Sequence, residues 1–130
     1  MILLDTDIMI DLLRRYPPAV AWLESCGEEV VALPGFVVME LLQGCKNKTE
    51  QTRLLKGVTR CRVLWPSSER CHEAITLFAS YHRSHGVGVL DVLIAQVAIE
   101  TGMALHTFNA KHYASISSLI TVQPYEKDKV

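Results

Sequence analysis

Three carboxylates stand where the sequence predicts a buried or half-buried charge. Asp5 ends the apolar run at residues 2–4, Glu40 lies within one apolar helical pattern, and Asp91 opens another. A carboxylate beside apolar sequence is costly unless hydrogen-bond donors or a cation accompany it. Oxygen ligands of this kind suit Mg²⁺, with Mn²⁺ as a substitute. We therefore predict that Asp5, Glu40 and Asp91 form an acidic site for a divalent metal.

Each of these acids also has a purely structural interpretation. Asp5 could accept hydrogen bonds from the N-terminus of the helix that follows it. Glu40 falls about 60° around its helix from Val37, at the margin of the apolar face, where a boundary glutamate is common. Asp91, taken alone, is better explained as a helix cap. The combination favours the metal site, because three acids beside apolar sequence in separate elements are not easily explained as three unrelated caps.

Four polar residues near these acids are predicted to support them. Asp7 immediately precedes the first helical apolar residue, so we expect it to cap that helix, and Thr6 lies between the two aspartates. Thr107 and Asn109 follow a short apolar strand and either hydrogen-bond a carboxylate or a water, or form an ordinary turn. These four residues complete the predicted site.

Apolar periodicity predicts an alternation of strands and helices along the chain. Strands are expected at residues 2–4, 30–33, 61–65, 103–107 and 119–122. Helices are expected at residues 8–13, 20–27, 37–45, 49–56, 68–85 and 90–101. Parallel strands need crossover connections, so this order predicts a short, mostly parallel sheet flanked by helices on both faces, with ligands at the carboxyl ends of the strands. In the first helix Asp11 precedes Arg15 by four residues, the spacing of a surface ion pair.

Composition narrows the classes of protein that the chain can represent. The 130 residues suit one domain, with residues 126–130 as a loose tail, and a net charge of −1 excludes a global basic field. No apolar run reaches the roughly 20 residues of a membrane span, so a cytoplasmic location is expected. Residues 46–62 contain six cations and one acid, Glu50. A solvated helix face is the commoner explanation of such a run, and a phosphate-contacting edge is the alternative.

Four short motifs occur in a recognisable order. They are Leu3-Leu4-Asp5-Thr6-Asp7, Val38-Met39-Glu40-Leu41-Leu42-Gln43-Gly44, Leu90-Asp91-Val92-Leu93-Ile94-Ala95 and Thr107-Phe108-Asn109-Ala110-Lys111-His112-Tyr113. Together they resemble the PIN domain family, specifically its small VapC-type toxin ribonucleases. Each motif alone is weak, whereas the four in order cover almost the whole chain.

The resemblance implies a single PIN-like domain over residues 1–130 with a three-layer α/β/α fold. It implies a Mg²⁺-dependent endoribonuclease that acts as the toxin of a toxin–antitoxin pair, with Asp5, Glu40 and Asp91 as catalytic metal ligands. His112 stands where relatives often have a fourth acid. The implied partners are RNA, a second copy in a homodimer, and a small antitoxin that wraps the helical hairpin at residues 8–23 and reaches the active site.

Two other functions fit parts of the sequence. A catalytically inactive PIN-like module could retain the same acids for protein association. A receiver-like switch could accept a phosphoryl group on an aspartate at a strand end, but Glu40 and Asp91 fall on predicted helices rather than at strand ends. The metal-dependent ribonuclease is therefore the preferred hypothesis.

Overall fold

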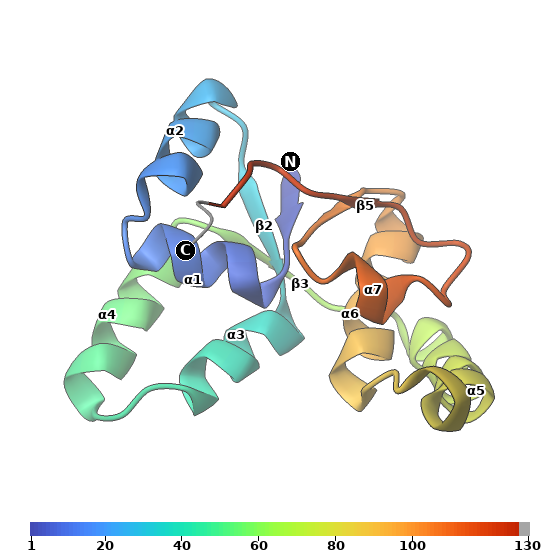
Figure 1. Cartoon of the computed structure of the whole chain (residues 1–130). Helices are drawn as coiled ribbons and strands as arrows, with labels where there is room; N and C mark the ends of the chain where they lie inside the picture. Colours follow the sequence, from blue (N-terminus) through green and yellow to red (C-terminus); the bar gives the residue numbers. More distant parts are fainter. Residues whose placement is uncertain (128–130) are drawn as a thin grey trace.

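The computed structural model describes residues 1–127 of the chain, and a parallel sheet lies at its centre (Figure 1). Within these residues five strands pair in the order β3-β2-β1-β4-β5, and every neighbouring pair is parallel. The strands are β1 (Ile2–Leu4), β2 (Val31–Pro34), β3 (Arg62–Leu64), β4 (Leu105–His106) and β5 (Thr121–Val122). The predicted α/β class with a central parallel sheet is confirmed, although β4 and β5 are shorter than their apolar runs.

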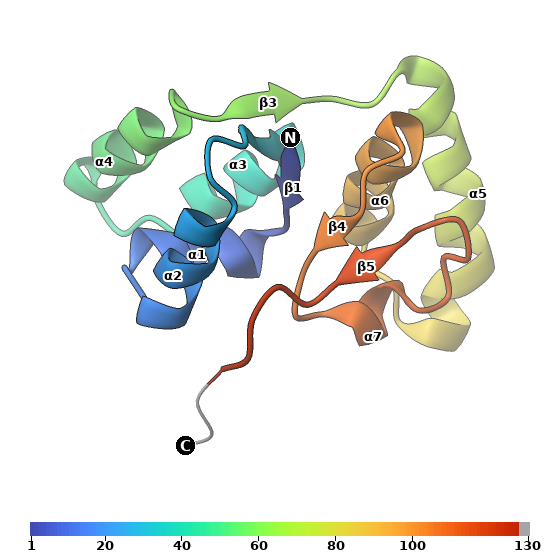
Figure 2. The same cartoon turned by 90° about the horizontal axis from the view of Figure 1, so that it is seen from above.

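Helices cover both faces of this sheet. Figure 2 shows α1 to α4 on one side and α5 and α6 on the other. The helices are α1 (Thr6–Leu13), α2 (Pro17–Ser25), α3 (Gly35–Gln43), α4 (Lys48–Val58), α5 (Ser68–His85), α6 (Val89–Thr101) and α7 (Ala110–Tyr113). The sequence does not predict α7, a single turn inside the last motif. The three-layer arrangement matches the PIN-like fold that the resemblance implies.

The core lies against the central strand β1 and the helix α6. Leu3 and Leu4 are completely buried because β1 has a neighbouring strand on each side and helices on both faces. Helix α6 is buried over most of its length, from Val92 to Ala98. This burial fixes α6 against the sheet, and with it the position of Asp91 in its first turn.

The carboxyl ends of the strands share one edge of the sheet because all pairs are parallel. Asp5 follows β1 at this edge, Thr107 follows β4, and α3 begins immediately after β2. Gly35, the first residue of α3, lies under the ring of Trp65, and a Cβ there would overlap that ring. The glycine therefore lets α3 start at the sheet edge, which places Glu40 on its second turn. Helix α3 also packs against both α1 and α6.

Two predictions for the first helix are wrong. Helix α1 begins at Thr6, with Asp5 rather than Asp7 as its N-cap, because Asp5 has an extended backbone and accepts a hydrogen bond from the Thr6 N–H. Asp11 pairs with Lys127 at 3.2 Å instead of Arg15. Helix α1 ends at Leu13 and Arg15 has a φ of 57°, so the helical four-residue spacing no longer applies there.

The structure describes only the first two residues of the loose tail that the sequence predicts at residues 126–130. Lys127 is held by Asp11, and Tyr125 donates a hydrogen bond to the same carboxylate at 2.7 Å. Residues 128–130 lie outside the described residues. No helix of the described residues is long and apolar enough to cross a membrane.

Candidate acidic active site

Asp5 is a buried carboxylate held by three hydrogen bonds. Its side chain is 4% exposed, and it accepts from the Thr6 N–H at 2.8 Å, the Thr107 hydroxyl at 2.8 Å and the Tyr113 hydroxyl at 3.0 Å. Burial nevertheless raises the pKa of Asp5 from 3.8 to about 6, and the charge of Asp7 adds to the rise, while the hydrogen bonds oppose it. The charged form of Asp5 is thus well oriented but incompletely stabilised.

Glu40 is joined to Asp5 through a single residue. The Thr6 hydroxyl donates to Glu40 Oε1 at 2.8 Å, while the Thr6 N–H donates to Asp5. Thr6 therefore bridges a carboxylate on α3 to the one at the end of β1. Glu40 Oε2 receives no hydrogen bond from residues 1–127, which leaves it available to a ligand.

Asp91 has the capping role that the sequence left open. It lies in the first turn of α6, where Oδ2 accepts a hydrogen bond from the Gly88 N–H at 3.0 Å, so it caps the helix. Its other oxygen receives no hydrogen bond from the described residues. Asp91 therefore stabilises α6 and still has one free oxygen.

Tyr113 is the site residue that the sequence does not predict. Its ring is 3% exposed, and burial raises the pKa of its hydroxyl above the ordinary value. The negative charges of Asp5, Asp91 and Glu40 raise that pKa further. Of the three predicted acids, only Asp5 contacts this hydroxyl, and Glu40 and Asp91 affect it through their charge alone. The only signal in the sequence is its place as the last residue of the fourth motif, at residues 107–113.

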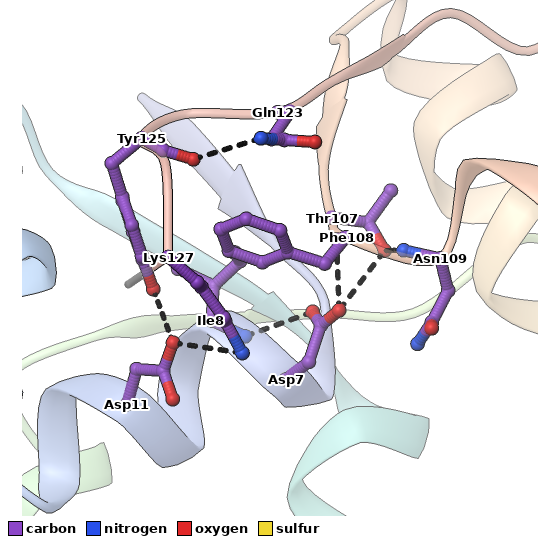
Figure 3. A network of polar contacts seen from close by, with 9 residues as sticks. All are labelled: Asp7, Ile8, Asp11, Thr107, Phe108, Asn109, Gln123, Tyr125 and Lys127. Carbon is purple, nitrogen blue, oxygen red and sulfur yellow. Dashed lines mark hydrogen bonds and ion pairs between the residues drawn. The ribbon is translucent and has the colours of Figure 1, made fainter. Parts of the chain in front are cut away.

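The remaining predicted residues join α1 to the segment after β4 (Figure 3). Asp7 Oδ1 accepts from the Ile8 N–H and Oδ2 from the Phe108 N–H, both at 2.8 Å. Burial raises the pKa of Asp7, and these backbone hydrogen bonds oppose the rise. The Asn109 N–H donates to the Thr107 hydroxyl at 2.9 Å, while the exposed Asn109 side chain makes no hydrogen bond within residues 1–127. Thr107 is thus both a donor to Asp5 and an acceptor.

The C-terminal segment crosses the same edge of the sheet. Tyr125 lies against the rings of Phe108 and Trp22 and donates to Asp11, and Lys127 lies 4.5 Å above the centre of the Phe108 ring. Figure 3 shows this segment above α1. The Lys127 charge lowers the pKa of Asp7 and so partly offsets the effect of burial. The Lys127 ammonium group therefore stabilises the negative charge of Asp7.

The carboxylate oxygens of Asp5, Glu40 and Asp91 are the kind of ligand that a hard divalent cation such as Mg²⁺ prefers. The acids are carboxylates, and neither salt bridge within the described residues involves Asp5, Glu40 or Asp91. The side chains are not gathered as closely as a metal requires, since no three acidic, histidine or cysteine side chains of residues 1–127 form such a cluster. Asp91 faces its own helix N-terminus instead.

The comparison with known families decides where the chain belongs. The model of the PIN domain matches residues 2–116, which include every acid described above. The chain belongs to the PIN domain family. The predicted resemblance is confirmed, and the site is located on the part of the PIN domain that the match covers. No curated protein matches the chain.

Solved PIN-like structures resemble the chain over nearly its whole length. The chain is 27% identical to one in VapBC2 from Rickettsia felis bound to a promoter DNA fragment, with a TM-score of 0.75 over 94% of this chain and 98% of that one. It is 25% identical to a chain of FitAcB from Neisseria gonorrhoeae, with a TM-score of 0.66 over 95% and 98%. A chain of a toxin–antitoxin complex from Klebsiella pneumoniae is 24% identical and has a TM-score of 0.76. The match covers 98% of this chain and 100% of that one, and it is evidence for the fold alone.

Proposed function

We propose that this PIN domain is a metal-dependent endoribonuclease and the toxin of a toxin–antitoxin pair. The observation that carries the proposal is the buried Asp5 carboxylate at the carboxyl edge of the sheet, which Thr6 links to Glu40 on α3. Carboxylates alone would repel an RNA phosphate, so such a site needs cations to bind one. The family match and the solved VapBC relatives support the same function.

Asp5, Glu40 and Asp91 would hold Mg²⁺, for which Mn²⁺ could substitute. When bound, the ion supplies a Lewis acid that lowers the pKa of water for attack at phosphorus and offsets the negative charge of the phosphate. The chain's own groups orient the acids for this role. Thr107 and Tyr113 fix the Asp5 carboxylate, and Thr6 fixes that of Glu40.

Cleavage of defined single-stranded RNAs by the purified chain tests the proposal. We expect cleavage with Mg²⁺ and none with EDTA, because the acids then face the phosphate without a cation. Asp5→Asn should be inactive, whereas Glu73→Gln, which removes an exposed acid on α5, should cleave as the wild type does. Equal cleavage by the wild type and by Asp5→Asn would show a contaminating nuclease. Cleavage that persists in EDTA would refute the metal mechanism, and metal binding without cleavage would favour the inactive interaction module.

The proposed antitoxin site is the helical hairpin at residues 8–23. A hollow of about 820 Å³ lies along this hairpin and combines apolar side chains with charged ones at its margin. It is lined by Leu12, Arg15, Pro17, Val20, Ala21, Leu23, Glu24, Gly27 and Arg60. Such a mixture suits a partner segment with an apolar face.

Hydrogen exchange tests this partner site. A coexpressed small antitoxin should slow exchange in residues 8–23 and inhibit cleavage, whereas slow exchange confined to α5 would place the partner elsewhere. The homodimer is also a proposal, and the exposed apolar side chains of Met39 and Trp65 are candidates for burial between two copies. Light scattering on the antitoxin-free chain measures that state.

A further inference from the structure

A cavity extends from the acidic site along the whole of α1. Its volume is about 490 Å³, and Thr6 and Glu40 are part of its lining. Arg14, at the other end of α1, also lines it, so the cavity is about 12 Å long at 1.5 Å per helical residue. The opposite walls come from α3 and from α4 with the loop before it. The cavity thus leads directly away from the proposed metal ligands.

Three cations line this cavity and none of them has an acidic partner. Arg14, Lys46 and Arg53 are exposed, and their side chains form no ion pair or hydrogen bond within residues 1–127. The other charged residue besides Glu40 is Glu50, whose carboxylate accepts the Lys46 N–H at the start of α4. The cations are therefore free to bind an external anion.

The basic surface continues beyond the cavity onto α4. A second hollow of about 520 Å³ shares Arg53 with the first and is lined otherwise by Lys48, Thr49, Thr52 and Lys56. These residues belong to the basic run at residues 46–62 that the sequence left with two explanations. A solvated helix face does not account for Arg53, which lines both hollows, the first of which also includes Glu40.

The floor of the first cavity is apolar. Leu41 and Leu54 are buried and Ile10 is half-buried, while Leu13 is an exposed apolar residue of the same lining. A surface with apolar groups at its base and cations at its rim matches the chemistry of a single-stranded nucleotide, which has a flat base and a charged phosphate. The volume lies within the range of roughly 300–1,000 Å³ that small-ligand sites occupy.

We propose that this cavity between α1, α3 and α4 is a substrate subsite, which seats a nucleotide of single-stranded RNA next to the cleaved phosphate. Arg14, Lys46 and Arg53 contact its backbone phosphates, and the apolar floor contacts the base. The inference rests on the proposed function and assigns the substrate's path away from the acids. It makes Arg14 and Arg53 positioning residues rather than catalytic ones.

RNA binding by the Asp5→Asn chain tests this subsite without cleavage. The probe is a fluorescein-labelled single-stranded RNA about 12 nucleotides long, followed by anisotropy between about 50 and 200 mM salt. Arg14→Gln and Arg53→Gln should each weaken binding several-fold and reduce the slope of log affinity against log salt by about 0.7, the value for one lost phosphate contact. Arg83→Gln, on the distant and exposed end of α5, should change neither quantity.

The same substitutions in the cleaving chain separate this inference from the proposed function. Arg53→Gln should raise KM and leave kcat almost unchanged, because the metal ligands are intact. If the wild type cuts RNA but Arg14→Gln and Arg53→Gln retain its KM and salt slope, the subsite is refuted and the cavity is left to a protein partner. If no RNA is cut but binding still depends on Arg14 and Arg53, the proposed nuclease fails and the subsite stands.

Discussion

Replacing the central acid by its amide should make the metal-free protein more stable. One tenfold change in proton affinity corresponds to about 1.4 kcal/mol, so raising the pKa of Asp5 from 3.8 to about 6 costs the folded chain about 3 kcal/mol when Asp5 is charged. In Asp5→Asn the amide oxygen can accept the Thr6 N–H, and the NH₂ group can donate to Thr107 and Tyr113. The substitution therefore removes the buried charge and keeps the contacts.

The effect should depend on pH with a definite sign. The pKa is higher in the folded than in the unfolded chain, so the folded state binds the proton more tightly and is favoured at low pH. The advantage of Asp5→Asn should be near zero at about pH 4, grow through pH 6 and level off above about pH 7. At pH 8 in EDTA we expect about 3 kcal/mol, or roughly 10 °C in Tm.

Denaturant unfolding and thermal scans in EDTA at several pH values measure this difference. A second arm adds Mg²⁺, which should raise the Tm of the wild type and leave that of Asp5→Asn unchanged, because a ligand stabilises only the state that binds it. If Asp5→Asn is less stable than the wild type at pH 8 without metal, the three hydrogen bonds outweigh the cost of burial. The physical account of Asp5 would then be wrong.

Three further substitutions test the contacts around this acid. Tyr113→Phe removes a hydrogen bond that lowers the pKa of Asp5, so the acidic limb of the pH–rate profile should move to higher pH and stability should fall by about 1–2 kcal/mol. Thr6→Val removes the donor to Glu40 and should weaken Mg²⁺ binding about 10-fold in a calorimetric titration, with little change in kcat at saturating metal. Asp91→Asn retains a cap oxygen for α6, so circular dichroism should show an unchanged Tm within about 2 °C while cleavage is lost.

The sequence predicts the framework because each strand and helix has its own local pattern. The apolar run before Asp5 and the helical spacing around Glu40 and Asp91 locate all three acids on the correct elements. Sheet order follows less directly, but alternating elements leave few arrangements other than a parallel sheet. The common edge of that sheet then places Asp5 near Glu40, whereas Asp91 caps its own helix.

The contacts between distant segments are not predictable in this way. Apolar periodicity indicates which face of a single helix or strand is buried, but not which other segment packs there. The hydrogen bond from Tyr125 to Asp11, 114 residues apart in the sequence, therefore could not be predicted. The same limit applies to Gln96, a polar residue in the apolar helix α6 that is 1% exposed. Its Oε1 has no hydrogen-bond partner in the described residues, and no local pattern indicates that burial. Spacing alone also misplaced the cap of α1, because it located the first apolar residue rather than the first helical one.

The separation of Asp5 from its partners has a consequence for synthesis of the chain. Thr107 and Tyr113 follow it by 102 and 108 residues, so at about 5–20 residues per second they are made roughly 5–20 s later. Until then β1 lacks its neighbour β4, and no hydroxyl orients the Asp5 carboxylate. A nascent or truncated chain therefore lacks the assembled site. Residues 8–23 emerge far earlier, so the proposed antitoxin site is synthesised well before the proposed active site is complete.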